Sequence, residues 1–266
     1  MITKSQIRAQ LEQLGVPCDK PLIVHVSLRA VGKIDGGGQT LLDCLIERVT
    51  KRGGVLVVPS HTWANLLNDR QIKLDMTDSK TCVGTFADIA TADARGTRTV
   101  NPTHSVTVFG DKAVVDEFIK GEKETLTPNA PQGCYGKICD HDGSVLLIGV
   151  GHNKNTYMHC VEEMMGVEDR LTLEPVKMLV KLPDGSIFEK DFHYMTERLG
   201  DVSARFPKYE PAFRLYGVIK DGLIGNAKTQ LCSARGIKNV MELVRERSAK
   251  RELLSDDTPL DENLYV

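Results

Sequence analysis

The run Val145-Leu-Leu-Ile-Gly-Val-Gly-His-Asn-Lys-Asn-Thr-Tyr-Met-His-Cys-Val-Glu-Glu-Met-Met165 predicts a buried strand, a tight turn and a helix. Residues 145–150 form an apolar segment of the length that a fully buried strand takes, and the segment stops at Gly151. Asn155 and Thr156 are N-cap candidates for a helix that meets no breaker before Gly166. In open α/β sheets ligands bind at the carboxyl ends of strands, so the polar residues of this turn and helix are candidates for a functional site.

Three polar side chains share one face of this predicted helix. Thr156, His159 and either Glu162 or Glu163 lie three or four residues apart, and the spacing alone permits either glutamate. A carboxylate one turn from an imidazole fixes its tautomer and favours its protonated form, which suits general acid/base catalysis. The alternative is a solvated or capping pair, which is common on helices. The position after a buried strand and a turn favours the functional interpretation.

Two other chemistries involve the same helix. Cys160 follows His159, but adjacent helix positions point about 100° apart, which argues against a Cys–His nucleophile. His152, His159 and Glu162 could instead be the ligands of a metal-dependent hydrolase. The His-to-His spacing of seven residues is not a usual zinc pattern.

Composition bounds the class of protein. With 266 residues, 41% of them hydrophobic, and without repeat or linker, the chain is expected to form one domain over residues 1–266. A net charge of −2 argues against binding to nucleic acid or an anionic membrane and favours a cationic small molecule. No apolar run is long enough to span a membrane, and no signal peptide is expected at the start. Seven cysteines without a Cys-x-x-Cys pair indicate free thiols, so we expect the cytoplasm.

The first predicted strand also leads into a loop rich in glycine. Residues 21–28 are apolar and β-branched, Gly36, Gly37 and Gly38 follow, and a helix is expected over residues 39–51. Glycines before a helix N-terminus can cradle phosphate, but the spacing matches neither a dinucleotide fingerprint nor a P-loop. The remaining helices are expected over 4–14, 85–94, 111–120 and 237–251, with one more that contains Glu197 and Asp201. A strand is expected over 53–60, and residues 98–110 are expected to form an Asn101-Pro102 turn that runs into an alternating strand. We also expect a hairpin over 176–192 with its turn at Asp184-Gly185, a turn at Asp221-Gly222, and a mobile acidic tail from Leu254.

The segment Gly-Val-Gly-His-x-x-Asn-Thr-x-x-His-x-x-Glu at residues 149–162 resembles the segment that marks the aminoglycoside 3-N-acetyltransferase family. Other segments match that family in the same order: His25 to Gly32 before the glycine loop, Arg98 to Gly110, and Gly222 to Leu231. The resemblance implies an α/β fold with a mixed β-sheet flanked by helices, the antibiotic N-acetyltransferase fold and not the GNAT fold.

Two positions depart from the family pattern. Asn101 stands where the family has His, although His104 could partly substitute for it. Cys134-Tyr135 replaces the family's Ser-Pro. These departures leave open a coenzyme A binder without catalysis.

The resemblance implies an enzyme that transfers an acetyl group from acetyl-coenzyme A, without a metal, to an amine, commonly the 3-amino group of a 2-deoxystreptamine ring. His159 would be the general base, the family register selects Glu162 to orient it, and Thr156 would lie near the thioester. The main-chain N–H groups of the loop at 27–32 are candidate stabilisers of the oxyanion. By the same resemblance the contacts to the cosubstrate would be Ser27, Leu28, Arg29, Val31, Gly32 and Ser105.

An aminoglycoside carries several ammonium groups, so carboxylates are its natural partners. Asp75 lies in a polar segment where the family has a variable insertion, and Asp191 and Glu197 lie at the far end of the hairpin and in the helix expected after it. Trp63, at a strand end, is either core or a wall of the acceptor site. The true acceptor could be another cellular amine, and the chain is expected to be a monomer or homodimer.

Overall fold

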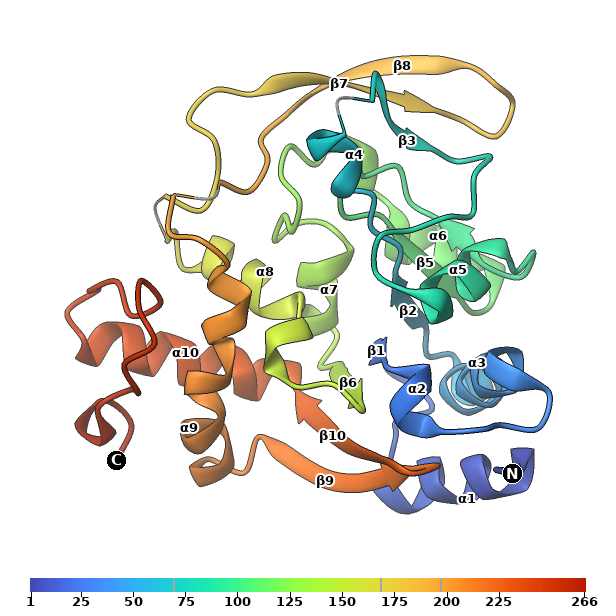
Figure 1. Cartoon of the computed structure of the whole chain (residues 1–266), viewed down its shortest axis with the longest axis horizontal. Helices are drawn as coiled ribbons and strands as arrows, with labels where there is room; N and C mark the ends of the chain where they lie inside the picture. The colour runs from blue at the N-terminus through green and yellow to red at the C-terminus, as the bar shows by residue number, and fades with distance from the viewer. Residues whose placement is uncertain (69, 168, 197) are drawn as a thin grey trace.

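The computed structural model describes residues 1–68, 70–167, 169–196 and 198–266. Its centre is a seven-stranded sheet with the order β4-β5-β2-β1-β6-β10-β9, in which β2, β1 and β6 are parallel and the flanking strands are antiparallel (Figure 1). The strands are β1 (Leu22–Val26), β2 (Leu56–Pro59), β4 (Thr97–Arg98), β5 (Val106–Phe109), β6 (Ser144–Ile148), β9 (Ile219–Ile224) and β10 (Ala227–Ser233).

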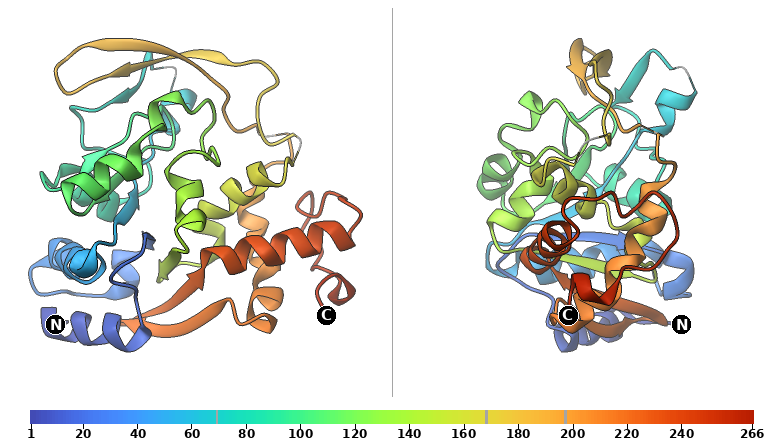
Figure 2. Two further views of the ribbon diagram at one scale, coloured as in Figure 1. Left: turned by 180° about the vertical axis from the view of Figure 1, so that it is seen from behind. Right: turned by 90° about the vertical axis from the view of Figure 1, so that its left-hand side faces the viewer.

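The inner strands are apolar because helices cover both faces of the sheet. Ile23 of β1 pairs with Val57 on one side and Val145 on the other. The two faces hold separate core clusters. On one face pack α1 (Lys4–Leu14), α2 (Leu28–Val31), α3 (Gly37–Val49) and α5 (Thr85–Ala92), and on the other α6 (Lys112–Ile119), α7 (Cys134–Asp140), α8 (Tyr157–Met164), α9 (Glu210–Leu215) and α10 (Ala234–Arg247) (Figure 2).

Local sequence explains where these helices begin and end. Thr3 and Gln6 form a capping box at the start of α1, and Gly15 ends the helix with φ of 80°. Ser233 caps α10 by accepting a hydrogen bond from the Gly236 amide. The helices predicted over residues 4–14, 39–51, 85–94, 111–120 and 237–251 are confirmed within a few residues at their ends. None of the helices in the described ranges has the length and apolarity needed to cross a membrane.

A second sheet of three strands lies beyond the first and contains the predicted hairpin. Its order is β3 (Ile72–Asp75), β7 (Val176–Lys181) and β8 (Ile187–Phe192), and the hairpin stands at the top of Figure 1. The Asp184 carboxylate accepts from the Ser186 amide and closes the turn. The short helix α4 (Ala64–Leu67) lies next to β3.

Three expectations about local structure were wrong. Asp221 and Gly222 lie inside β9, and the chain reverses at Gly225, where φ is 59°. Asp201 caps a 3-10 helix, Val202–Tyr209, so the helix expected to contain it begins after it; Glu197 lies outside the described residues. The turn expected after Asn101-Pro102 leads into a strand, β5, as predicted, but all four residues of β5 are buried rather than alternating.

The prediction of a mobile C-terminal tail was also wrong. Leu254, Leu260, Leu264 and Tyr265 are buried and belong to the core cluster that contains α8 and α10. The Arg247 guanidinium donates to the Val266 carbonyl. The apolar residues spaced through this acidic segment hold it against the protein, because their burial outweighs its charge.

Candidate active site

The candidate active site lies at one edge of the large sheet. The parallel strands β1, β2 and β6 all end there, and Ser27, His61 and His152 follow them within a few residues. Strand β5 runs the other way, since Pro59 pairs with Val106, so His104 precedes it at the same edge. Topology therefore brings together polar residues from four segments of the chain.

His159 and Glu162 contact each other as the family register predicted. Nδ1 of His159 lies 3.2 Å from Oε2 of Glu162, and the two side chains are 12% and 3% exposed. Phe206 packs edge-on against the imidazole, with 4.7 Å between ring centroids. Glu163 points elsewhere and accepts hydrogen bonds from Thr127 Oγ1 and the Asn129 amide. Of the two glutamates, Glu162 is therefore the partner of His159.

The second oxygen of Glu162 is bound by an arginine. Nε of Arg170 donates to Glu162 Oε1 at 2.7 Å, and its terminal nitrogens lie 2.9 and 3.2 Å from the carboxylate of Glu252. Burial works against the charge of Arg170, but the two carboxylates outweigh it and raise the pKa of the guanidinium. We call Glu252, Arg170, Glu162 and His159 the charge chain.

Three further imidazoles line this edge. Burial lowers the pKa of His104 to about 3 and that of His61 well below its usual value. The rings of His61 and His104 lie 4.4 Å apart. Burial also lowers the pKa of His25 to about 3. These rings are neutral at pH 7, so they can donate or accept hydrogen bonds but add no positive charge.

Tyr135 and Asn101, which both depart from the family pattern, hold His61 and His104 in place. The Tyr135 hydroxyl lies 2.8 Å from Nε2 of His61. The Asn101 side chain accepts from the amides of Thr103 and His104 and donates to the carbonyl of Pro128. Asn101 thus shapes the loop that presents His104.

The residues expected to contact coenzyme A divide into accessible and buried groups. Ser27 caps α2 by accepting from the Ala30 amide, Leu28 is half-buried and Arg29 is exposed. Val31 is fully buried in the core, and its amide, like that of Gly32, bonds within the turn. The Ser27 amide donates to the Ile148 carbonyl. The expected oxyanion role is therefore wrong for the amides of Ser27, Val31 and Gly32, and the expected side-chain contact is wrong for Val31.

Ser105 is buried and cannot contact a cosubstrate as expected. Its hydroxyl donates to the Ser60 carbonyl at 2.7 Å and accepts from Nε of Arg98 at 3.2 Å. Arg98 also donates to the carbonyls of Ser60 and Asp78, and burial lowers its pKa to about 10. Ser105 and Arg98 tie strand β2 to the loop after β3.

Two alternatives from the sequence lose support. Cys160 is fully buried, and desolvation raises the pKa of its thiol well above the usual value, so it is not an accessible nucleophile. His152 is also buried and contacts Asn155 and Phe213. Within residues 1–68, 70–167, 169–196 and 198–266, no three metal-ligating side chains are grouped, so the hydrolase set is not assembled.

Thr156 stands at the N-cap of α8, one turn before His159, and its hydroxyl makes no capping hydrogen bond. It is half-buried. The hydroxyl is therefore not needed to begin the helix.

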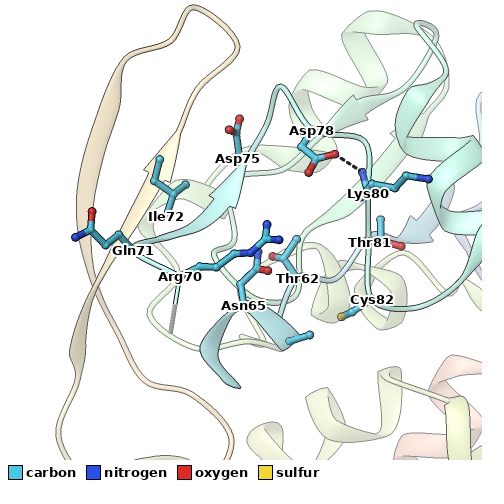
Figure 3. A pocket seen from close by; sticks show the side chains of 11 residues that line it. Thr62, Asn65, Arg70, Gln71, Ile72, Asp75, Asp78, Lys80, Thr81 and Cys82 are labelled. Carbon is cyan, nitrogen blue, oxygen red and sulfur yellow. Dashed lines mark hydrogen bonds between the residues drawn. The ribbon is translucent and has the colours of Figure 1, made fainter. Parts of the chain in front are cut away.

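A cavity of about 630 Å³ opens between the end of β2 and the second sheet (Figure 3). Thr62, which follows His61, lines it together with Asp75 and Asp78. Asp75 is paired with Lys181 at 3.0 Å. Trp63 beside the cavity is 39% exposed, so it is not a core residue. Asp191 does not line the cavity; it is exposed on β8 and lies 3.7 Å from Lys177.

Sequence reasoning missed Arg170 and Phe206 altogether. Arg170 follows α8 in an irregular segment, and no spacing rule connects it to Glu252, which lies 82 residues further along the chain. Phe206 lies in the 3-10 helix Val202–Tyr209, a segment without any predicted site residue. Their roles depend on which distant segments pack together, and the sequence carries no local signal for either.

The sheet, its helices and the buried histidine–carboxylate pair at its edge define an α/β enzyme suited to taking a proton from a substrate. Residues 23–244 match the family model described as aminoglycoside 3-N-acetyltransferase, and the chain belongs to that family. This membership makes it an acetyltransferase of aminoglycosides, with the fold that the resemblance predicted.

Known proteins similar to this chain agree with the assignment. Aminoglycoside N(3)-acetyltransferase IV of Salmonella is 27% identical over 88% of this chain and 84% of its own length. Aminoglycoside N(3)-acetyltransferase IX of Micromonospora chalcea is 23% identical over 90% and 91%. A crystal structure of a mutant aminoglycoside acetyltransferase AAC(3)-IVa with a gentamicin is 25% identical, with a TM-score of 0.71 over 90% of this chain and 86% of that one.

Proposed function

We propose that this enzyme acetylates the 3-amino group of an aminoglycoside, with His159 as general base and Glu162 as the carboxylate that orients it. The observation that carries this proposal is the hydrogen bond between Nδ1 of His159 and Glu162 at the carboxyl edge of the parallel strands. Because Glu162 occupies Nδ1, Nε2 is the nitrogen that remains for the acceptor.

The reaction needs a base because an ammonium group has no lone pair with which to attack. His159 takes a proton from the acceptor amine at Nε2, and Glu162 stabilises the imidazolium that forms. The amine nitrogen then bonds to the acetyl carbon while the carbon–sulfur bond breaks. The nitrogen loses its second proton to the leaving sulfur, so that coenzyme A departs as the thiol. Attack is direct, because the thiol of Cys160 is buried. Thr156, with its hydroxyl uncommitted, is proposed as a hydrogen-bonding group near the thioester.

We assign the cosubstrate acetyl-coenzyme A to the loop around α2. A neighbour with a TM-score of 0.72, AAC-IIIb, holds CoASH. Ser27, Leu28, Arg29 and Gly32 retain exposed surface here. Within the described residues no carboxylate pairs with Arg29 or with the nearby Lys33, which suits an anionic cosubstrate.

The acceptor is proposed to lie near the cavity, where Asp75 offers a carboxylate. Trp63 does not line the cavity itself, but it is exposed between the lining residues Thr62 and Ala64 and is proposed as an aromatic wall for the acceptor. One similar protein, a mutant of AAC(3)-IVa, has been solved in complex with a gentamicin and with apramycin. We propose Asp191 as an outer partner for ammonium groups; Glu197, the other carboxylate predicted to bind the acceptor, lies outside the described residues. We further propose that residues 1–266 act as one domain, since both core clusters share one sheet. We propose that this domain is a monomer or a homodimer and that it acts in the cytoplasm.

The test is His159→Ala, assayed by thiol release from acetyl-coenzyme A with gentamicin or apramycin. We expect turnover to fall by about 10²- to 10⁴-fold, with coenzyme A affinity close to wild type. His141→Ala, at an exposed position, is the control and should keep full turnover. Turnover that survives in His159→Ala would remove this residue from the mechanism. If the wild-type enzyme acetylated other amines but neither gentamicin nor apramycin, the proposal of an aminoglycoside acceptor would be wrong.

A further inference from the structure

The carboxylate of Glu162 is shared between His159 and Arg170. We propose that Arg170 and Glu252 are positioning residues, through which the segment after α10 fixes the orientation of the catalytic imidazole. This inference rests on the proposed role of His159.

The geometry of the charge chain is continuous from the surface to the imidazole. Each oxygen of Glu162 has one partner: Oε2 lies 3.2 Å from His159 Nδ1, and Oε1 accepts from Arg170 Nε at 2.7 Å. Arg170 in turn places its two terminal nitrogens 2.9 and 3.2 Å from Glu252. The exposed fraction is 6% for Arg170 and 32% for Glu252. The Glu162 carboxylate is thus fixed from both sides and cannot turn without breaking a buried ion pair.

The formal charges of the four side chains in the charge chain sum to zero only when His159 carries a proton. Glu162 and Glu252 contribute one negative charge each, and Arg170 contributes one positive charge. An imidazolium at His159 brings the sum to zero in a region with little water to screen it. Without Glu252 the same set would carry a net positive charge. The outer carboxylate therefore offsets the positive charge of the buried Arg170 guanidinium.

The outer end of the chain is itself held in place. The Leu254 amide donates to Glu252 Oε1 at 2.6 Å, and the Leu254 side chain is buried. Nζ of Lys208 donates to the carbonyls of Leu253 and Asp256. The C-terminal segment, which lies beside α10 at the left of Figure 1, is therefore a fixed support for Arg170.

The first experiment compares Arg170→Met, Arg170→Lys and Glu252→Gln in the thiol-release assay with gentamicin. We expect kcat to fall roughly 10- to 100-fold in Arg170→Met, with KM changed by less than about 3-fold, because the base is misdirected while the acceptor site is intact. Glu252→Gln should lower kcat by a smaller factor. Arg170→Lys should recover part of the loss, since it restores the charge but not the planar fork.

Lys208→Met is the matched control. It removes contacts to the same C-terminal segment but touches no member of the charge chain. Its kcat should equal that of wild type. An equal loss in Lys208→Met and Arg170→Met would show that the segment matters only for packing and would overturn the proposal.

A double-mutant cycle separates positioning from a general structural effect. If Arg170 acts through Glu162, adding Arg170→Met to Glu162→Gln should lower kcat by less than about 3-fold further. Losses that multiply would refute the coupling. If Arg170→Met does not fold, the cycle of Glu252→Gln with Glu162→Gln gives the same test at the more exposed end.

Failure of this inference and failure of the proposed base give different results. Retained turnover in His159→Ala contradicts the base, whatever the cycle shows. A loss in His159→Ala together with multiplicative losses in the cycle leaves His159 as base and removes only Arg170 and Glu252 from its support.

Discussion

At the scale of single residues, the function depends on which side chain each polar atom faces. Glu162 and Glu163 are adjacent in the sequence and equally spaced for a contact with His159. On α8 they diverge, so that one binds the imidazole and the other binds the loop at Thr127. Helix geometry separates neighbours by about 100°, which is why two similar residues take different roles.

Glu162→Gln should therefore lose far more activity than Glu163→Gln. The amide at 162 cannot stabilise an imidazolium, and we expect turnover to fall by roughly 10-fold or more, within the range that general-base catalysis supplies. Glu163→Gln keeps an acceptor for the Asn129 amide and should stay within about 3-fold of wild type. The measurement is kcat by thiol release for both variants. A larger loss in Glu163→Gln would reverse the assignment.

Tyr135→Phe tests the support of the neutral histidines. The substitution removes the hydroxyl 2.8 Å from His61 Nε2 and leaves a buried polar atom without a partner. The free energy of unfolding should fall by about 1–3 kcal/mol, measured by urea denaturation. Tyr216→Phe, at an exposed position, should change it by less than about 0.5 kcal/mol. Equal stability of the two variants would contradict this role of Tyr135.

At the scale of elements, the site depends on how closely α2 approaches the end of β6. Gly149 has φ of 66°, and a Cβ added there would lie 2.4 Å from Cβ of Ala30. Only glycine combines this conformation with this contact. The approach sets the position of the loop that begins at Ser27, and with it the proposed cosubstrate site.

Gly149→Ala should be destabilising and should weaken coenzyme A binding. Gly185→Ala is the matched control, because Gly185 also has positive φ, 85°, but nothing lies within 4 Å of an added Cβ. We expect Gly149→Ala to lower the free energy of unfolding by about 1–3 kcal/mol more than Gly185→Ala, as in other overpacked sites. Urea denaturation and a coenzyme A titration measure the two effects. If Gly149→Ala were destabilised but bound coenzyme A with unchanged affinity, the cosubstrate site would not lie at α2.

At the scale of the whole molecule, burial of several imidazoles links stability to pH. Burial lowers the pKa of His25 and His104 to about 3 and that of His152 to about 4. In the unfolded chain a histidine titrates near its ordinary value of about 6.5, so between that pH and the folded pKa the unfolded state binds more protons. Stability is therefore fully present above about pH 6.5 and is lost as the pH falls toward 4.

The free energy of unfolding should thus decrease steeply below pH 6. Each such histidine contributes roughly 1.4 kcal/mol per pH unit once it is protonated in the unfolded chain. Urea denaturation at pH 7, 6 and 5 measures the slope. His25→Gln should reduce the slope, whereas His141→Gln, at an exposed position, should leave it unchanged. A free energy that stays constant from pH 7 to 5 would contradict the neutral state of the buried rings.

Sequence alone was enough to predict most of the elements and the pair formed by His159 and Glu162. The apolar run at 145–150 is typical of a buried strand, and the helix that follows it is confirmed as α8. Local periodicity is a short-range property, so it can be read from neighbouring residues. It failed at Asp221-Gly222, where a dipeptide typical of turns lies inside a strand because cross-strand pairing outweighs local preference.

The surroundings of His159 and Glu162 depend on tertiary packing and not on local sequence. Ser105 and Val31 look like binding residues in the sequence but are buried by the segments that pack over them. Arg170 and Glu252 look like ordinary surface charges, yet they meet at Glu162 because the C-terminal segment folds back onto α8. Burial and long-range ion pairs depend on which distant segments come together, and no local pattern encodes that.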